Sequence, residues 1–480
     1  MSARRYLVVG AGLSGLSAAH RLRELEPSAH LELWEASART GGWIATETLP
    51  ASRLGIASEQ ALVVDLGPES ILGPRSEAHR EEHAALGLVA RLGLEDRVIR
   101  TRSDRHGAYV VSRGRLARIP EGFSLIGPGD LVGFAKSDVV SLEGKARAAL
   151  ELAMPARPRA PSDDESLASF VRRRFGWEVL ERLAQPLASG IYGADPEILG
   201  LLATMPRFLE MEAAHGSVTR ALIAAARATT DEVGEGARYG LFVSFDAGMQ
   251  VLTDALTDRV RDALRLERAA VRMERDASGV EVIDDAGRAE RFDAVVVAQP
   301  AHRAAGLLEG IDREAAHALA AIPHGSAATV TFAWRREDVP HPLDAYGFVV
   351  PRVERRRILA STWSSEKWPD RAPAELALVR VFAAGDDDLA GRDDALLALE
   401  ARRELADLMG ITAPPRFTKV VRYERAMPLY GPEHVARRDA IAARLAELPD
   451  VALAGNSLFG VGIPDTIAAG ERAAEKLATG

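Results

Sequence analysis

Three glycines near the N-terminus, Gly10, Gly12 and Gly15, have the spacing Gly-x-Gly-x-x-Gly, and a carboxylate follows at Glu35. Glycines in this pattern permit a tight turn, a close approach of backbone to a pyrophosphate, and close packing of a helix on a strand. Glu35 stands 20 residues after Gly15, where its carboxylate can accept hydrogen bonds from ribose hydroxyls. The pattern therefore predicts a dinucleotide site.

The elements that must position these residues flank the turn. An apolar run before Gly10 predicts a strand, the stretch LSGLSAAHRLREL from residue 13 has helical spacing, and HLELWEAS at residues 30–37 predicts a second strand. Ala11, Leu13 and Ser14 complete the turn of this β-α-β unit. A β-α-β turn without a ligand is the competing interpretation.

A second glycine-rich stretch, at residues 455–477, has the sequence GNSLFGVGIPDTIAAGERAAEKL. Its first eight residues include three glycines, an alanine-rich amphipathic segment follows, and Pro464 suits a first helical position. Such turns let a bound group approach the N-terminus of a helix. An ordinary helix cap is the alternative.

The bulk composition restricts the class of protein. A chain of 480 residues predicts two or three domains, and a formal net charge of −9 argues against nucleic acid as the main partner. The absence of cysteine excludes disulfides, thiolate metal sites and cofactors bonded through cysteine sulfur, and no metal site is predicted. No signal peptide or membrane-spanning segment is predicted, so we expect a cytoplasmic protein, with peripheral attachment to the inner membrane face left open.

Residues 81–240 are typical of helices and irregular connections. Ser162 is predicted as an N-cap, because Glu165 three residues later completes a capping box. The Arg-Arg-Arg run at residues 172–174 is interpreted as a solvated helix face, or alternatively as a contact for an anionic lipid or an acidic substrate.

Strand patterns return after residue 240. A hairpin with its turn at 285–287 leads to a buried strand at 294–297, and a later helix ends at Gly410. Further strands are predicted at 328–334, 346–350, 358–363, 376–383 and 451–455.

The residues after Glu35 favour FAD over NAD. The stretch EASARTGGW at 35–43 contains a second glycine pair, which lets backbone pack against a dinucleotide already bound at the first turn. It resembles the second landmark of the FAD-dependent amine oxidase superfamily, and VVDLGPES at 63–70 resembles the stretch that passes beneath the flavin in those proteins. The resemblance implies FAD contacts from Arg39, Gly41, Gly42, Trp43, Gly67 and Pro68.

Later segments narrow the resemblance. QPLASGIY at 185–192, ATMPRFLEMEAAHGS at 203–217, SFDAGMQVL at 244–252 and GNSLFGVGIPD at 455–465 match family segments in the same order over nearly the whole chain. The chain thus resembles the oxygen-dependent porphyrinogen oxidases, which act on protoporphyrinogen or, in a bacterial branch, on coproporphyrinogen III.

The resemblance implies an α/β fold of three parts. A Rossmann-like FAD-binding domain of the amine oxidase type is expected from residues 1–80, 240–302 and 448–480. Residues 81–239 are expected to form a mainly helical domain facing the substrate or a membrane, and residues 303–447 a substrate-binding domain with a mixed sheet.

The resemblance also implies noncovalent FAD, with the N-terminus of the last helix directed at the flavin ring. Asn456, Val461, Gly462 and Ile463 are the implied contacts there, and the backbone of Val271 is the implied contact for the adenine end. The single Gly-x-Gly-x-x-Gly pattern predicts no separate NAD(P)H domain. The resemblance implies oxygen as the electron acceptor.

The implied reaction is the six-electron oxidation of a porphyrinogen, with each electron pair passed to oxygen as hydrogen peroxide. Because the flavin carries this chemistry, no catalytic side chain is predicted. By resemblance, the Gly190 carbonyl accepts a pyrrole N–H, Arg75 pairs with a propionate, and Val349, Thr362 and Phe382 enclose the macrocycle. The alternatives are a turn residue at Gly190 and sheet core at the last three.

Coproporphyrinogen III is the predicted substrate, because residues 142–150 and 361–373 resemble the branch that uses it. The alternatives are protoporphyrinogen IX, an amine oxidase or carotenoid desaturase on the same fold, and a non-enzymatic protein-binding member. Aromatic residues make up only 5% of the chain, which argues against an aromatic amine cage, and the intact glycines argue against a member without FAD. A haem-pathway partner enzyme and the oligomeric state are left open.

Overall fold

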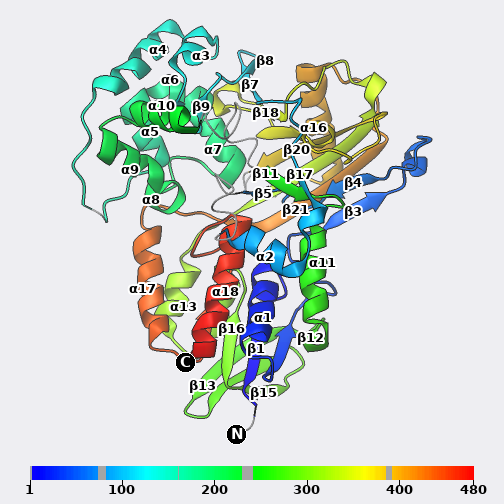
Figure 1. The fold of residues 1–480 in the computed structure, drawn as a ribbon, viewed down its shortest axis with the longest axis vertical. Helices are drawn as coiled ribbons and strands as arrows, with labels where there is room; N and C mark the ends of the chain where they lie inside the picture. Colours follow the sequence, from blue (N-terminus) through cyan, green and yellow to red (C-terminus); the bar gives the residue numbers. More distant parts are fainter. Residues whose placement is uncertain (1–2, 74–82, 161, 230–241, 385–391, 480) are drawn as a thin grey trace.

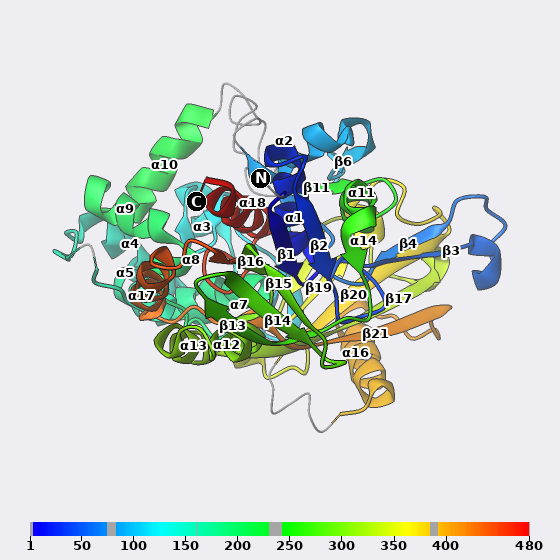
Figure 2. The same cartoon turned by 90° about the horizontal axis from the view of Figure 1, so that it is seen from below.

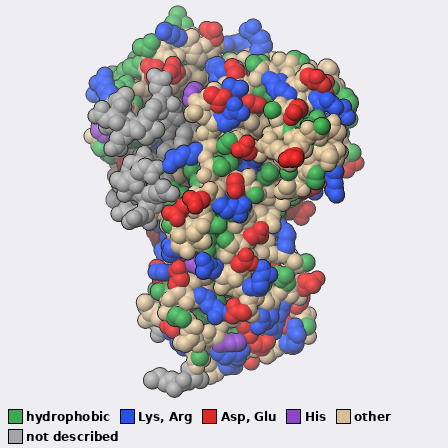
Figure 3. Space-filling model, turned by 45° about the vertical axis from the view of Figure 1, so that its right-hand side comes forward, with side chains coloured by type: hydrophobic (Ala, Val, Ile, Leu, Met, Phe, Trp, Pro, Cys, Tyr) green, Lys and Arg blue, Asp and Glu red, His purple; other side chains and the backbone are tan. Residues whose placement is uncertain are grey.

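The computed structural model describes residues 3–73, 83–160, 162–229, 242–384 and 392–479. Figure 1 shows a lower part built around a parallel sheet and an upper part in which a group of helices lies beside a larger mixed sheet. Acidic and basic side chains are interspersed on the face shown in Figure 3. Within these ranges no helix is both long and apolar enough to cross a membrane.

The lower part contains a five-stranded parallel sheet. At its centre lies β1 (Arg5–Val9), between β2 (His30–Trp34) and β16 (Ala294–Val297), and β12 (Leu264–Arg265) and β22 (Val451–Leu453) form the edges. The central strands are almost wholly apolar because both faces of the sheet are covered.

One face of this sheet is covered by α1 (Leu13–Leu25) and α18 (Ile463–Thr479), which lie side by side (Figure 1). A Cβ atom at Gly470 would lie 2.2 Å from the carbonyl oxygen of Ser14, so only glycine permits this approach. The C-terminal helix is therefore packed directly on the first turn of α1.

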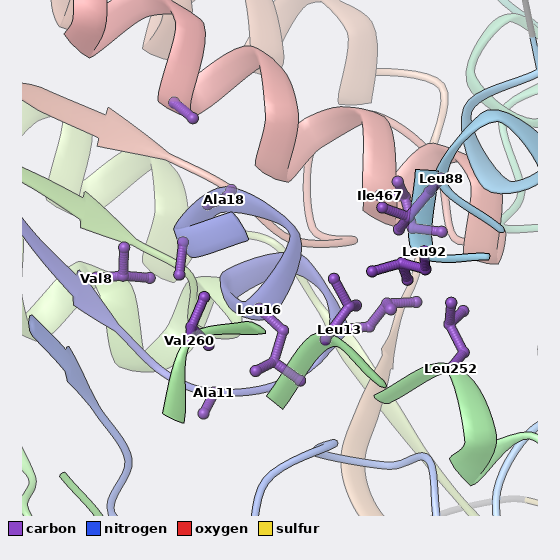
Figure 4. Close-up of a cluster of buried hydrophobic side chains, with 14 of the residues drawn as sticks. Val8, Ala11, Leu13, Leu16, Ala18, Leu88, Leu92, Leu252, Val260 and Ile467 are labelled. Carbon is purple, nitrogen blue, oxygen red and sulfur yellow. The ribbon is translucent and has the colours of Figure 1, made fainter. Parts of the chain in front are cut away.

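The core on this face also includes α2 (Ala84–Leu92) and α11 (Gln250–Arg259). Figure 4 shows apolar side chains from α1, α2, α11 and α18 in one cluster that also includes Val8 of β1. The side chains come from segments that are far apart in the sequence. Their shared burial holds these segments together in the lower part of the molecule.

The opposite face is covered by a small antiparallel sheet and two helices (Figure 2). The sheet consists of β13 (Ala270–Asp276), β14 (Gly279–Asp284) and β15 (Ala289–Phe292). The helices are α12 (Ala301–Leu308) and α13 (Arg313–Ala320).

The upper part contains a seven-stranded sheet covered on one face by α16 (Asp394–Met409). Neighbouring strands are antiparallel except for the β18–β7 pair. In spatial order the strands are β21 (Phe417–Pro428), β17 (His324–Arg335), β20 (Leu376–Ala384), β19 (Ala360–Trp363), β18 (Gly347–Val349), β7 (Tyr109–Ser112) and β8 (Arg115–Arg118).

The helical group has its own core, formed around Phe170, Phe175 and Phe208. A π-helical segment, Leu180–Ala184, joins the sixth helix to the seventh. The helices are α3 (Leu131–Lys136), α4 (Leu142–Ala149), α5 (Leu167–Phe175), α6 (Trp177–Val179), α7 (Gln185–Tyr192), α8 (Leu201–Thr204), α9 (Pro206–His215) and α10 (Val218–Thr229).

Smaller elements connect these parts. Two more helices, α14 (Ser364–Lys367) and α17 (His434–Ala446), lie after β19 and β21. The short strands are β3 (Thr46–Leu49), β4 (Leu62–Asp65), β5 (Ile71–Leu72), β6 (Val98–Arg100), β9 (Phe123–Ser124), β10 (Gly127–Pro128) and β11 (Phe242–Phe245).

Several predictions of local structure are confirmed. The β-α-β unit, the hairpin between β14 and β15, the strand at 294–297 and the helix end at Gly410 are all present. The predicted strands of the upper sheet are present as β17 to β20, whereas β21 and the β7–β8 hairpin were not predicted.

Two predictions within the helical group are wrong. The helix cap is Ser166, whose hydroxyl accepts a hydrogen bond from the Ser169 N–H, and not Ser162, because the chain just before the helix pairs with Gly200 instead. The arginine run is not a solvated face: Arg174 is fully buried, and Arg173 pairs with Glu212.

Candidate functional site

The first glycine turn is shaped by contacts that exclude side chains. Gly10 has a φ of +102°, and a Cβ atom at Gly15 would lie 1.8 Å from the Gly10 carbonyl oxygen. Gly12 differs, because a Cβ there would have no described neighbour closer than 3.9 Å. Two glycines therefore form the turn, and Gly12 leaves its outer face open.

The N-terminus of α1 fits an anionic group. Gly12 is the N-cap and provides no side-chain cap, so the first N–H groups of the helix are left for another acceptor. The Ser14 hydroxyl on this first turn is buried and has no partner among the described residues. The helix dipole adds partial positive charge, so this cradle suits the pyrophosphate of a dinucleotide.

The second glycine pair lies against the first turn. The Gly41 N–H donates to the Ala11 carbonyl over 2.8 Å, and Gly41 forms an isolated parallel bridge with Gly12. The Arg39 guanidinium donates to the carbonyls of Thr40, Gly42 and Ile44 and so braces the loop. Leu13, the first residue of α1, is buried beneath this loop in the core.

Glu35 lies at the end of β2, beside the turn. Its Oε2 accepts from the Ala11 N–H over 2.8 Å, and its Oε1 accepts from the N–H and hydroxyl of Ser37. The Arg268 N–H donates to the Glu35 carbonyl, which brings the segment before β13 to the same place. Val271 follows in β13 with its side chain 53% exposed, so it is not strand core.

The segment at Gly67 and Pro68 crosses between the lower part and the mixed sheet. A Cβ at Gly67 would lie 1.8 Å from the Trp43 carbonyl oxygen, which places this segment directly against the second glycine pair. The Gly67 carbonyl accepts from Arg380 over 2.6 Å. Trp43 itself is 45% exposed.

Arg380 is a buried cation that the sequence analysis missed. It lies in β20, donates to the Gly67 carbonyl and to the Tyr423 hydroxyl, and that hydroxyl donates to the Leu66 carbonyl. The signal in the sequence was an arginine in the middle of the apolar strand LALVRVFAA. Arg380 ties the segment at Gly67 to the face of the mixed sheet.

A largely buried ion pair, between Glu69 and Lys367, lies beside Arg380. Glu69 accepts from the Lys367 ammonium over 2.9 Å and from the Ser364 hydroxyl. Burial alone would raise the pKa of Glu69, but the charges of Lys367 and Arg380 lower this pKa to about 2. Glu69 therefore stays ionised and holds this end of the segment in place.

The predicted substrate residues share one face of the mixed sheet. Val349 is paired with Ala360, and Ala360 with Phe382, so their side chains point to the same side, and Thr362 is two residues from Ala360 on that side. Val349, Thr362 and Phe382 are each only partly buried. Arg380 extends from the same face toward Gly67, so this face is turned toward the glycine turns.

Gly190 lies opposite this face, in α7. A Cβ at Gly190 would lie 3.6 Å from Val349 Cγ1, which is ordinary contact distance. Because Gly190 is in the last turn of α7, its carbonyl is among those that a helix end leaves without a regular intrahelical partner. The structure thus brings Gly190 to the predicted substrate face, whereas Arg75 lies outside the described residues.

The C-terminal glycine loop, residues 455–462, precedes α18. Gly460 has a φ of +122°, and a Cβ there would lie 2.4 Å from Asp465 Cγ. The Gly462 N–H donates to the Asp465 carboxylate over 3.2 Å, and Ile463 begins the helix. Asn456 and Val461 lie within this loop.

In the described ranges no group of three or more His, Asp or Glu side chains is arranged to hold a metal ion.

A glycine turn at a parallel sheet, a second glycine-rich loop against it and a mixed sheet facing both define the class of the protein. The chain belongs to the family of flavin containing amine oxidoreductases, which matches residues 13–478. The protein is therefore an FAD-dependent oxidoreductase, and the fold predicted from the sequence is confirmed.

Individual relatives are similar over their whole length. The coproporphyrinogen III oxidase of Staphylococcus aureus is 30% identical, with 98% of both chains covered. That of Mycobacterium tuberculosis is 33% identical over 98% of this chain and 97% of the relative. A crystal structure of a candidate protoporphyrinogen oxidase from Exiguobacterium sp. 255-15 matches with a TM-score of 0.84 and 27% identity over 100% of this chain and 99% of that one.

Proposed function

We propose that this protein oxidises coproporphyrinogen III to coproporphyrin III with FAD as its redox cofactor. The observation that carries the proposal is the approach of Gly190 in α7 to the partly buried face formed by Val349, Thr362 and Phe382, beside the segment at Gly67. A flat, mainly apolar macrocycle suits a partly buried, mainly apolar face of this kind. The full-length similarity to coproporphyrinogen III oxidases supports this choice of substrate.

The residues named above have distinct roles in this proposal. The first turn (Gly10 to Gly15), the second glycine pair and the N-terminus of α1 hold the pyrophosphate, and Glu35 lies toward the ribose. The backbone at Val271 lies toward the adenine end, and the loop from Asn456 to Ile463 lies toward the flavin ring. FAD, when bound, supplies a two-electron acceptor for C–H oxidation.

The substrate side of the site orients the macrocycle. We propose that the Gly190 carbonyl, in the last turn of α7, accepts a pyrrole N–H, while Val349, Thr362 and Phe382 pack on the ring face. Three two-electron oxidations remove six electrons and six protons, and oxygen takes up each pair as hydrogen peroxide. Arg75 stays a proposed partner for a propionate.

The division into three domains belongs to the same proposal. We propose that the FAD-binding domain consists of residues 1–80, 240–302 and 448–480, the mainly helical domain of residues 81–239, and the substrate-binding domain of residues 303–447.

The direct test is a visible spectrum of the purified protein, followed in the same cuvette by coproporphyrinogen III under air. Flavin absorption bands and growing porphyrin fluorescence are expected, with slower turnover of protoporphyrinogen IX in a parallel cuvette. Faster turnover of protoporphyrinogen IX would replace the substrate and keep the reaction class. Flavin bands with no porphyrin would move the protein to amine or carotenoid substrates.

Contact with a membrane surface is a further part of the proposal. Val132, Leu142 and Trp177 in the helical group are 62%, 84% and 58% exposed. We propose peripheral contact through these side chains, at the inner face of a cell membrane. Sedimentation with phospholipid vesicles tests it, and equal recovery of wild type and Trp177→Ser in the pellet would contradict it.

A further inference from the structure

The C-terminal glycine loop is held by side chains from outside it. Tyr430, just after β21, places its hydroxyl between two backbone groups of the loop. This hydroxyl donates to the Asn456 carbonyl and accepts from the Gly460 N–H over 3.0 Å. One oxygen atom therefore joins the two ends of a five-residue segment.

A second side chain holds the middle of the same segment. His434, the first residue of α17, lies with Nε2 3.2 Å from the Leu458 carbonyl oxygen, and its ring stacks on Tyr430 with 3.8 Å between ring centroids. Because a carbonyl oxygen only accepts, the contact with Leu458 requires the proton to be on Nε2. The other ring nitrogen, Nδ1, is buried and has no partner among the described residues. Burial lowers the pKa of His434 to about 4, which keeps this ring neutral.

Both side chains are buried as deeply as core residues. Tyr430 is 2% exposed and His434 is 1% exposed. The Tyr430 carbonyl also accepts from the Gly200 N–H over 2.7 Å, so the same residue is tied to the start of α8. The anchor points of the loop are therefore fixed by the tertiary structure and not by the loop itself.

The loop has a particular need for such anchors. Its three glycines allow the backbone many conformations, and ordering them costs more conformational entropy than ordering other residues. The loop provides N–H and carbonyl groups that must have a fixed direction if they are to receive a ligand. A site that is ordered before binding does not lose affinity to ordering the loop.

We propose that Tyr430 and His434 are positioning residues, which hold the C-terminal glycine loop in the geometry that receives the flavin before the cofactor binds. This inference rests on the proposed role of Asn456, Val461 and Gly462 at the flavin. Neither side chain is proposed to touch the substrate. Their action is through the direction of the loop backbone.

The test compares Tyr430→Phe with wild type in two states. In the FAD-free protein, hydrogen–deuterium exchange of peptides covering 455–462 is expected to become faster, because Phe keeps the ring but removes the acceptor for Gly460. In titrations with FAD, the dissociation constant is expected to rise about tenfold, the change that corresponds to about one net hydrogen bond. The matched control is Tyr346→Phe, which removes a buried hydroxyl that donates to the Arg102 carbonyl elsewhere.

A second pair of variants separates positioning from folding. His434→Gln keeps a side-chain N–H donor for the Leu458 carbonyl, whereas His434→Leu removes it. We expect FAD affinity near that of wild type for the first and a loss of about tenfold for the second. Equal losses in both variants would show that only packing matters at this position and would overturn the inference.

The outcomes distinguish this inference from the proposed function. If wild type binds FAD and produces porphyrin while Tyr430→Phe retains both its FAD affinity and its slow loop exchange, this inference alone fails. If wild type binds no FAD, the proposed function and this inference fail together. Faster loop exchange with weaker FAD binding, and neither change in Tyr346→Phe, is the result that supports the inference.

Discussion

The two ends of the molecule are stabilised in opposite ways. Around the first glycine turn, elements approach closely because side chains are absent: the Gly15 and Gly470 positions have no space for a Cβ atom. In the helical group, Arg174 is fully buried and pairs with the equally buried Glu151. The packing of the first region depends on the absence of Cβ atoms at two glycines, whereas the packing of the second depends on a buried charge cluster.

The charge cluster is satisfied on every side. The Arg174 guanidinium also donates to Glu212 over 3.2 Å and to the Gly216 carbonyl over 2.7 Å. Glu151 in turn accepts from the Ser217 hydroxyl and the Val218 N–H. We therefore expect an added side-chain atom to destabilise the region around the first glycine turn. In the helical group, we expect the removal of one charge of the buried cluster to be destabilising.

The largest expected effect is from Arg174→Met. Removing the guanidinium leaves Glu151 buried without its countercharge, and such a change costs about 3–5 kcal/mol of the free energy of unfolding. Chemical denaturation of the FAD-free protein measures it. The matched control is Arg172→Met on the same helix, whose partner Glu197 is exposed and for which about 1 kcal/mol is expected. Equal losses in the two variants would contradict the structural role of the cluster.

The next effect compares two glycines of one turn. Gly15→Ala places a methyl group on the Gly10 carbonyl oxygen, so we expect a loss of about 1–3 kcal/mol in stability together with loss of FAD. Gly12 has a φ of −71°, which alanine adopts freely, and has no described neighbour closer than 3.9 Å. Gly12→Ala is therefore expected to fold normally and to bind FAD at least about tenfold more weakly, as measured by flavin fluorescence. Wild-type affinity in Gly12→Ala would show that the open face does not receive the pyrophosphate.

Lowering the pH should destabilise the contact of His434 with the C-terminal glycine loop before it destabilises the charge cluster of the helical group. The folded pKa of His434 is about 4 and lies below its ordinary value of 6.5, so the unfolded chain binds more protons between these values and stability falls as pH is lowered through them. The loss from pH 6.5 to 5 is at most about 2 kcal/mol for this group.

The helical cluster should respond only in stronger acid. Burial would raise the pKa of Glu151, but hydrogen bonds from Ser217 and Arg174 lower it, so its contribution is present above the ordinary value of 4.5 and is lost below that pH. Unfolding free energies at several pH values, in wild type and His434→Gln, measure the difference. An unchanged slope between pH 6.5 and 5 in the variant would contradict this assignment.

The smallest effect is expected at the substrate face. Gly190→Ala adds a methyl group at contact distance from Val349 and removes a glycine from a helix, so stability should rise by about 0.5–1 kcal/mol. The same methyl group projects beside the proposed ring-binding face at Val349, so KM for coproporphyrinogen III should rise while FAD affinity stays constant. An unchanged KM would place the substrate elsewhere.

The glycine patterns could be interpreted from the sequence because their meaning is local. Gly10, Gly12 and Gly15 act within one turn, and the strand and helix on either side follow from nearby apolar spacing. Gly41 and Gly42 lie against Ala11 and Gly12, and their contact with a dinucleotide stays a prediction.

The helix cap and the arginine run show where local patterns failed. Ser162 and Glu165 have the spacing of a capping box, but a tertiary bridge between Ser166 and Gly200 delays the helix start. An arginine triplet is usually solvated, yet Arg174 is buried, because Glu151 and Glu212, 23 residues before it and 38 residues after it, supply countercharges. No pattern within a short window contains that information.

The glycine turns and the β-α-β unit beside them follow from the sequence, because each depends on residues close together in the chain. The family also follows from the sequence, because its segments match in the same order over nearly the whole chain. Only the tertiary structure decided that Arg380 ties Gly67 to the mixed sheet and that Tyr430 and His434 hold the C-terminal glycine loop. Those contacts join segments that are distant in the chain. The partners in these contacts are backbone groups, which every residue type carries, so no sequence pattern identifies them.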